Sequence, residues 1–323
     1  MYSYKKLEEK LKSLGKSKSD MTKDLRISSR TIAKLSKGER IANHVLVKIA
    51  SFLGRGAADL FSEICNNPIS QALREEKEHK VPGGIYHELQ VRMAYNSNHI
   101  EGSTLTEEET CLIFETGSIQ SKNALRIDDL IEAANHFRAL DYVIDAALLP
   151  LSEEIIKRLH LLLRQGTGDS SLDWFAVGEC KERENMVGGK ATCPVKDVEK
   201  AMRSLLGSYS AKEVIAFEDI VSYHAEFEAI HPFQDENGRV GRLITVKECL
   251  KYGVTPFFIE DSKKAFYYRG LSNWSQDKAL LIETCLGAQN SFEALLKELG
   301  ISESSYPPSN KRLLEQRRNS NLR

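Results

Sequence analysis

Hydrophobic residues at helical spacing dominate residues 84–299, and this pattern restricts the fold of the chain to a mainly helical one. The segments that we expect to be helical are 84–97, 106–115, 125–147, 152–165, 195–206, 216–230, 239–252 and 261–271. One interruption lies between Trp174 and Cys193, where Val187-Gly188-Gly189 is typical of a short β-hairpin. The expected fold class is therefore all-α with one small hairpin.

The N-terminal part of the chain has the pattern of four short amphipathic helices, at residues 4–14, 18–25, 28–35 and 43–53. Residues 1–55 contain 14 Lys or Arg residues and 5 Asp or Glu residues, a net charge of +9. Because the whole chain has a net charge of −1, the remaining residues carry −10. A basic module joined to an acidic body indicates an anionic partner for the first segment only.

Changes in composition divide the chain into four parts. We expect a helical module at residues 1–62, a linking segment at 63–83, the main helical domain at 84–299, and a polar, basic, loosely structured tail at 300–323. Whether the charge-dense residues 74–80 of the link are helical stays open from the sequence.

Composition also excludes several classes of protein. With 41% hydrophobic residues the chain is not wholly disordered. No stretch approaches the roughly 18 uncharged apolar residues of a membrane helix, and the N-terminal residues lack the pattern of a secretory signal. The six cysteines include no Cys-x-x-Cys pair and fit neither a zinc site nor a disulfide framework. We therefore expect a cytoplasmic protein without a membrane partner.

The most informative segment joins two of the expected helices and reads His231-Pro232-Phe233-Gln234-Asp235-Glu236-Asn237-Gly238-Arg239-Val240-Gly241-Arg242. Pro232 ends the first helix, and the second begins with free backbone N–H groups and the positive end of a helix dipole, which together bind anions. Arg239 and Arg242 share a helix face near the same anion. Asp235 is suited to Mg²⁺, which accompanies nucleotide phosphates, and His231 can act as a base near neutral pH.

This segment closely resembles the signature of Fic-domain proteins, His-Pro-Phe-x-Asp/Glu-Gly-Asn-Gly/Lys-Arg-x-x-Arg. The family has a mostly helical fold, and most active members transfer AMP from ATP to a hydroxyl group of a target protein. The resemblance covers about residues 82–287. It implies that His231 is the general base and that Asp235 is the Mg²⁺ ligand.

The resemblance also assigns the residues around the nucleotide. The positions that it places in the binding of ATP and its phosphates are Glu236, Asn237, Gly238, Arg239 and Arg242. It further implies that the hairpin residues Val187, Gly188 and Gly189 form a flap, which holds the target segment by strand addition beside the nucleotide.

Glu236 departs from the family pattern, because family members usually have Gly at this position. A carboxylate beside the triphosphate adds repulsion. If the position needs a positive φ, a residue other than Gly also costs about 1 kcal/mol or more. The backbone N–H remains, so we expect the phosphate cradle to persist.

A second motif lies upstream, at Ser97-Asn98-His99-Ile100-Glu101-Gly102. It resembles the inhibitory motif of the same family, which implies that Ser97 and Glu101 restrain the activity. In that interpretation Glu101 pairs with Arg242, so that Arg242 cannot hold the γ-phosphate and ATP binds unproductively. Without the resemblance, the same residues are an ordinary helix end with a C-cap glycine.

Two further groups are weaker candidates. Tyr267 and Tyr268 could line an adenine pocket, and we include Tyr268 in the expected ATP site, although aromatic residues at helical spacing are usually core. His224 lies seven residues before His231, and helix packing is the favoured interpretation for it.

Residues 14–53 resemble the repressor-type helix-turn-helix domains of phage repressors. Residues 21–35 match the two-helix core, and Lys37-Gly38-Glu39 matches the turn that follows. The resemblance implies DNA binding through Ser29, Arg30 and Lys34 of the recognition helix, and it implies a homodimer. The alternative is a small helical bundle that serves dimerisation.

The sequence thus predicts Mg²⁺-dependent transfer of AMP from ATP to a Ser, Thr or Tyr hydroxyl of a target protein, or of the chain itself, restrained by Glu101. Two other functions stay open. One is a DNA-binding regulator whose Fic domain senses nucleotide with little or no catalysis, which Glu236 favours. The other is a hydrolase that removes AMP, with Glu101 positioning a water molecule.

Overall fold

The structure is a computed structural model that describes residues 4–36, 41, 43–54, 67–212 and 214–301. It confirms the all-α class and the hairpin. Among the described residues the only strands are β1 (Met186–Val187) and β2 (Lys190–Ala191), which pair antiparallel with Met186 opposite Ala191. No helix in the described part of the chain is long and apolar enough to cross a membrane.

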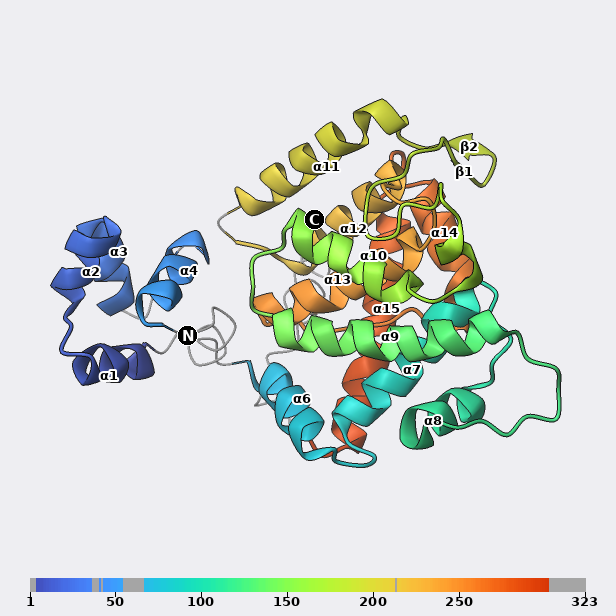
Figure 1. Cartoon of the computed structure of the whole chain (residues 1–323), viewed down its shortest axis with the longest axis horizontal. Helices are drawn as coiled ribbons and strands as arrows, with labels where there is room; N and C mark the ends of the chain where they lie inside the picture. The colour runs from blue at the N-terminus through green and yellow to red at the C-terminus, as the bar shows by residue number, and fades with distance from the viewer. Residues whose placement is uncertain (1–3, 37–40, 42, 55–66, 213, 302–323) are drawn as a thin grey trace, which may run out of the picture.

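The first four helices lie apart from the rest of the molecule (Figure 1). They are α1 (Lys5–Ser13), α2 (Lys18–Leu25), α3 (Ser29–Ser36) and α4 (Asn43–Phe52). Ser17 caps α2 in a reciprocal capping box with Asp20. Arg26 adopts a left-handed φ of 53° and turns the chain from α2 into α3. The two helices then pack over a small core that includes the buried residues Met21 and Leu35.

The remaining helices form the main body. They are α6 (Pro68–His79), α7 (Ile85–Ile100), α8 (Glu107–Thr116), α9 (Ile127–Ala146), α10 (Glu153–Arg164), α11 (Val195–Ser210), α12 (Phe217–Ile230), α13 (Asn237–Tyr252), α14 (Lys264–Ser272) and α15 (Ala279–Glu298), with two short 3₁₀ helices, η1 (Gly168–Ser171) and η2 (Asp261–Lys263). Each segment expected to be helical corresponds to one of these α-helices, with shifted ends.

Two of these helices were not among the expected segments. Helix α6 lies within residues 63–83, begins at an Asn67 cap followed by Pro68, and buries Ile69 and Leu73. It packs on α7 and α9, so the described part of the expected linking segment is helical and in contact with the main body. Helix α15 packs along α14. The tail at 300–323 lies almost entirely outside the described residues.

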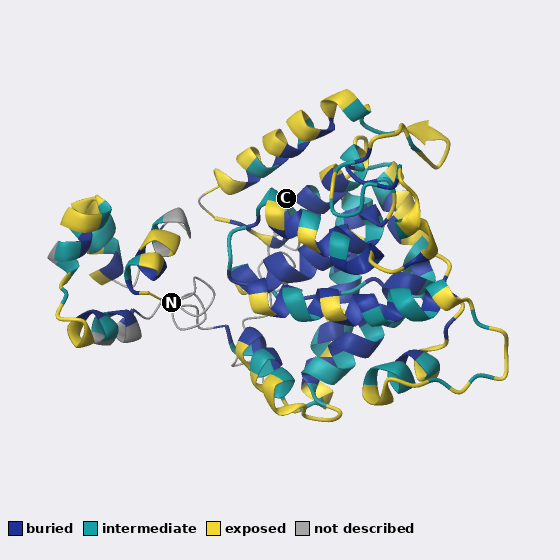
Figure 2. Ribbon diagram, in the orientation of Figure 1, coloured by how far each residue is buried: buried dark blue, intermediate teal, exposed yellow. Residues whose placement is uncertain are grey.

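Helix α13 is the centre of the main body. It packs on α7, α9, α10 and α12, and every residue from Arg239 to Lys251 is buried. Figure 2 shows the buried residues concentrated in this middle region. A helix buried on all sides fixes the position of its own N-terminus, because all of its neighbours hold it. The segment from His231 to Arg242 is therefore attached to the most rigid part of the protein.

Candidate active site

The loop between α12 and α13 is shaped by Asn237. Its Oδ1 accepts a hydrogen bond from the Phe233 N–H at 2.8 Å, and its Nδ2 donates to the Phe233 carbonyl at 3.0 Å. Because both polar atoms of this buried side chain are hydrogen-bonded to the main chain of the loop, the side chain fixes the conformation of the loop backbone. What Asn237 offers to an anion is its main-chain N–H group.

The N-terminus of α13 presents unsatisfied N–H groups. The first main-chain bond that enters the helix joins the Val240 N–H to the Glu236 carbonyl at 2.9 Å. The N–H groups of residues 237–239 therefore have no acceptor within the helix. The dipole of a helix of 16 residues adds positive potential at this end. The expected phosphate cradle is present as a structural feature.

Glu101, at the end of α7, lies against this cradle. Nη2 of Arg242 donates to Oε1 of Glu101 at 2.8 Å, which confirms the predicted contact between the two residues. Ser97 contributes as well, since Arg242 donates to its Oγ at 2.9 Å and to its carbonyl at 3.0 Å. A Cβ atom on Gly238 would lie only 2.5 Å from the Glu101 carboxylate. Only glycine allows the carboxylate to approach the helix end this closely.

One nitrogen of the Arg242 guanidinium makes no hydrogen bond within the described part of the chain. Its Nη1 is buried and has no hydrogen-bond partner among the described residues, and it lies 3.0 Å from the position of a Cβ on Gly238. Such an orphaned donor costs free energy unless a ligand or water satisfies it. The free N–H groups and this guanidinium nitrogen fit an anion such as a nucleotide phosphate.

Glu236 has a different position from the one that the sequence suggested. Its φ of 65° lies in the left-handed region, so the backbone cost expected for a residue other than Gly does apply. The side chain is completely buried and pairs with Arg239 and Arg164 (3.1 Å for Arg164), whose charges oppose its own. The expected repulsion of phosphate stays a prediction. Burial raises the pKa of Glu236 to about 7, against the opposing effect of the Arg239 guanidinium. Its carboxyl group is a buried structural partner of the two arginines beneath the cradle.

Arg239 and Arg164 belong to a buried network of charges. Arg239 also pairs with Glu132 of α9 at 2.6 Å and donates to Asn98 at 3.2 Å. The carboxylates that surround Arg164 of α10 belong to Glu132, Asp169, Asp235 and Glu236. The side chain of Arg239 is thus engaged by carboxylates, and phosphate binding by that side chain requires an exchange of partners.

His231 and Asp235 face the open side of the loop. His231 ends α12 with a left-handed φ of 52°, and its Nδ1 donates to the Glu228 carbonyl at 3.4 Å. This leaves Nε2 free to accept a proton. Burial lowers the pKa of His231, so the ring is neutral at pH 7. Asp235 is exposed, with Arg164 at 3.5 Å, and a hard cation can reach its carboxylate.

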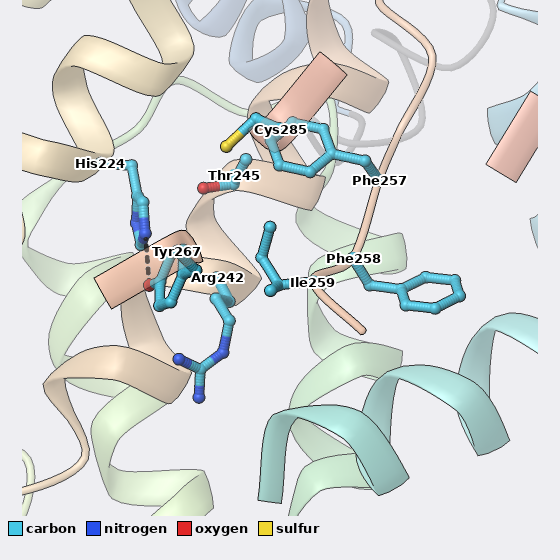
Figure 3. A pocket seen from close by; sticks show the side chains of 8 residues that line it. All are labelled: His224, Arg242, Thr245, Phe257, Phe258, Ile259, Tyr267 and Cys285. Carbon is cyan, nitrogen blue, oxygen red and sulfur yellow. Dashed lines mark hydrogen bonds between the residues drawn. The ribbon is translucent and has the colours of Figure 1, made fainter. Parts of the chain in front are cut away.

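Behind Arg242 lies a small pocket lined by aromatic residues (Figure 3). His224 Nε2 and the Tyr267 hydroxyl form a hydrogen bond of 2.8 Å, and burial lowers the pKa of His224 to about 3. The packing interpretation of His224 is confirmed, and Tyr267 is core. Tyr268, which the sequence predicts to contact ATP, lies on α14 with its side chain exposed. Partial burial and the nearby charge of Glu101 raise the pKa of its hydroxyl to about 12.

The hairpin is attached to the same loop. Gly188 and Gly189 have φ values of 56° and 78°, as a tight two-residue hairpin turn requires, and Val187 is exposed. The Lys181 N–H donates to the Pro232 carbonyl at 2.8 Å, and the Asn185 side chain donates to the Phe233 carbonyl at 3.1 Å. These bonds place the base of the expected flap beside the loop that carries His231.

Comparisons with known proteins agree with this geometry. Residues 150–249 match the model of the Fic/DOC family, and residues 6–65 match the Cro/C1-type HTH DNA-binding domain. The chain contains a Fic/DOC domain and a Cro/C1-type helix-turn-helix domain. The curated proteins named "Protein adenylyltransferase Fic" from Drosophila persimilis and Drosophila ananassae are each 29% identical to it over 206 residues. The aligned region spans 62% of this chain but only 38% of those relatives.

Solved structures show the same fold. A Fic domain containing signaling protein from Bacteroides thetaiotaomicron VPI-5482 is 24% identical, with a TM-score of 0.55, and the match covers 72% of this chain and 94% of that protein. Fic-1 (residues 134–508) from C. elegans is 15% identical, with a TM-score of 0.57, and covers 90% of this chain and 97% of that one. At these identities the likeness concerns the fold alone.

In the helix-turn-helix domain, the residues expected to contact DNA all lie on α3. Ser29 and Arg30 are exposed in its first turn, and Lys34 is half-exposed one turn later. The expected turn at Lys37-Gly38-Glu39 lies outside the described residues. The described part of the domain therefore presents α3 with polar and basic groups available to a partner.

The sequence did not reveal two residues of the Fic/DOC site, Glu132 and Arg164. Both are charged residues within helices whose buried faces are mainly apolar, although α9 and α10 also bury the polar residues Asp129, Asn135, His136 and His160. A charge on an apolar helix face is a signal for a buried ion pair. The partner, however, cannot be read from such a pattern.

Proposed function

We propose that this chain is a protein adenylyltransferase, which transfers AMP from ATP to a Ser, Thr or Tyr hydroxyl of a target protein and is restrained by Glu101. The observation that carries the proposal is the position of the Glu101 carboxylate, which lies between Arg242 and the free N–H groups at the start of α13, close to Gly238. We infer that this position is an anion site, which the Glu101 carboxylate occupies. The names of the curated relatives support the chemistry.

The residues suggest a division of roles. The N–H groups of residues 237–239 and the orphaned Nη1 of Arg242 hold the phosphates of ATP. Nε2 of His231 removes the proton of the incoming hydroxyl as its oxygen attacks the α-phosphorus. The bond from that phosphorus to the oxygen bridging to the β-phosphate breaks, and pyrophosphate leaves in line. Mg²⁺ bound at Asp235 supplies positive charge to the phosphates.

The restraint follows from the contacts of Arg242. Two of its nitrogens are engaged by Glu101 and Ser97, so only one remains for a phosphate. A carboxylate beside the cradle also repels the terminal phosphate of ATP. ATP then binds with its α-phosphate out of line with the hydroxyl. Removal of Glu101 lifts both effects.

The test is incubation of the full chain with ATP labelled at the α-phosphate. We expect weak labelling of the wild-type protein, stronger labelling of Glu101→Gly, and none of Glu101→Gly with His231→Ala. The His231→Ala protein should still bind ATP, because its phosphate contacts are intact. If label enters neither the wild type nor Glu101→Gly, in the presence or absence of a cell lysate, the proposal is wrong. Release of label from a pre-modified target would instead favour the hydrolase.

One observation favours a second candidate, a nucleotide sensor that does not catalyse transfer. Arg239 is held by Glu132 and Glu236, and Glu236 adopts a left-handed conformation where the family signature has Gly. A motif arginine locked in this way binds phosphate less well. ATP binding without labelling in all variants would support this function.

We also propose that the Cro/C1-type domain binds duplex DNA as a dimer, with α3 in the major groove. The net charge of +9 over residues 1–55 and the exposed Ser29 and Arg30 support this role. Gel-shift titrations of the full chain at two salt concentrations test it. Binding should fall steeply as salt rises, and Arg30→Ala should weaken it. Absence of binding at low salt would leave dimerisation as the better interpretation.

A further inference from the structure

Three side chains of the kinds that bind transition metals meet between α7 and α8. They are His87 on α7 and Cys111 and Glu115 on α8, and their donor atoms all lie within 4.8 Å of one another. His87 Nε2 lies 2.9 Å from Glu115 Oε1 and 4.0 Å from Cys111 Sγ. Cys111 and Glu115 are four residues apart, so they share one face of α8.

These separations are close to those around a single ion. A tetrahedral zinc ion with bonds of about 2.0–2.3 Å holds its ligand atoms about 3.3–3.8 Å apart. Small rotations of the Glu115 and Cys111 side chains are enough to reach this arrangement. The His87 side chain is 12% exposed and that of Glu115 is 49% exposed, so an ion can enter from solvent on the glutamate side.

The surroundings of His87 support a ligand role. Its Nδ1 is buried without a hydrogen-bond partner in the described part of the chain, and Glu88 Oε1 lies 3.7 Å from it. Arg92 holds the other oxygen of Glu88 at 2.7 Å. Metal-bound histidines are usually oriented by a carboxylate on the second ring nitrogen, and Glu88 is near enough to take this role, although it makes no hydrogen bond to Nδ1 here. The Phe114 ring packs edge-on against the imidazole, with centroids 5.4 Å apart, and limits its rotation.

The charge around Cys111 is negative. The carboxylates of Glu115, Glu88 and Glu107 are close enough to act electrostatically on its thiol. The same carboxylates attract a divalent cation, which then displaces the thiol proton. This environment does not suit a redox-active thiolate, because such thiolates need positive surroundings.

We propose that His87, Cys111 and Glu115 form a Zn²⁺ site whose fourth position is open to water, which the spacing of the cysteines in the sequence did not predict. The mixed nitrogen, sulfur and oxygen donors suit zinc and related transition metals, whereas Mg²⁺ requires oxygen ligands. The site is therefore chemically distinct from the one proposed at Asp235. A bound ion joins α8 to α7, the helix whose last turn carries Ser97 and Glu101.

Cobalt is the probe, because a thiolate bound to Co²⁺ gives a charge-transfer band in the near ultraviolet. We expect the chelator-treated full chain to show this band at one Co²⁺ per chain and to lose it when Zn²⁺ is added. Cys111→Ser should abolish the band. Cys193→Ser is the matched control, because this thiol lies beside the hairpin, where its hydrogen bond is to the Pro194 carbonyl, and it should keep the band. Glu88→Gln should weaken metal affinity about 10- to 100-fold.

A second variant and a second measurement cover loss of folding. Glu115→Gln keeps the sulfur and should weaken Co²⁺ binding at least as much as Glu88→Gln while retaining the helical circular dichroism of the wild type. Zn²⁺ in excess should raise the melting temperature of the wild type and of Cys193→Ser but not of Glu115→Gln. No band in the wild type, a band that persists in Cys111→Ser, or equal metal affinity in Glu115→Gln would each overturn the proposal.

Discussion

The candidate active site contains two ion pairs between a glutamate and an arginine of the segment 231–242. The two glutamates differ in how deeply they are buried. At the end of α7, Glu101 holds Arg242 with 31% of its side chain exposed. In the loop before α13, Glu236 holds Arg239 and is 0% exposed. The first pair faces the cradle and solvent, whereas the second lies beneath the cradle among Glu132 and Arg164.

The difference assigns different roles to the same residue type. Glu101 is partly exposed whereas Arg242 is buried, so water reaches the carboxylate and a phosphate can compete with it for the guanidinium. A buried pair cannot be broken cheaply, because either partner would be left as an uncompensated charge. The proposed function therefore treats Glu101 as a removable restraint, whereas Glu236 is a part of the fold.

The largest expected effect concerns stability. Glu236→Ala should lower the free energy of unfolding by about 3 kcal/mol, since it leaves Arg239 and Arg164 short of a buried partner. Glu101→Ala should lower it by only about 1 kcal/mol. Glu236→Gly should be about 1 kcal/mol less damaging than Glu236→Ala, because glycine adopts the left-handed φ without cost. Urea denaturation measures all three, and equal losses for Glu101→Ala and Glu236→Ala would remove the distinction.

The next effect concerns activity. Glu101→Gly should raise auto-modification about tenfold, which corresponds to about 1.4 kcal/mol of transition-state stabilisation. Adding Arg242→Ala should abolish this gain, because the freed guanidinium is its cause. Glu236→Gln, which keeps the shape of the side chain, should not activate. Transfer rates of these variants decide the matter, and activation by Glu236→Gln alone would show that the buried glutamate is the restraint.

The smallest effect is a shift in pH dependence. In the proposed mechanism the neutral form of His231 is the base, and burial lowers its pKa from the ordinary value of 6.5. Transfer should therefore persist at pH 6.5 and fall only as the pH drops through this lowered pKa. The Glu101 charge raises the His231 pKa in part, so Glu101→Gly should move the acidic limb to still lower pH, by less than about one unit. Loss of transfer already above pH 6.5, or an acidic limb of the pH–rate profile that moves to higher pH in Glu101→Gly, would contradict the assignment of the base.

Much of the site could be predicted because its parts are close together in the chain. The spacing of Arg239 and Arg242, the free N–H groups after Glu236 and the Gly188-Gly189 turn follow from local backbone geometry. The contact of Glu101 with Arg242 joins residues far apart in the chain. It was predicted only through the family resemblance, and the structure bears it out.

The sequence by itself determined the helical class, the hairpin, most helix positions and the chemistry of the motif, because each depends on residues within a few turns of one another. Only the tertiary structure decided that Glu236 turns inward to Arg164, that Glu132 holds Arg239, and that His87 meets Cys111. Helical periodicity shows which face of a helix is buried, but not which other helix covers it. Contacts between distant helices follow from how all the apolar faces pack together, and no local pattern contains that information.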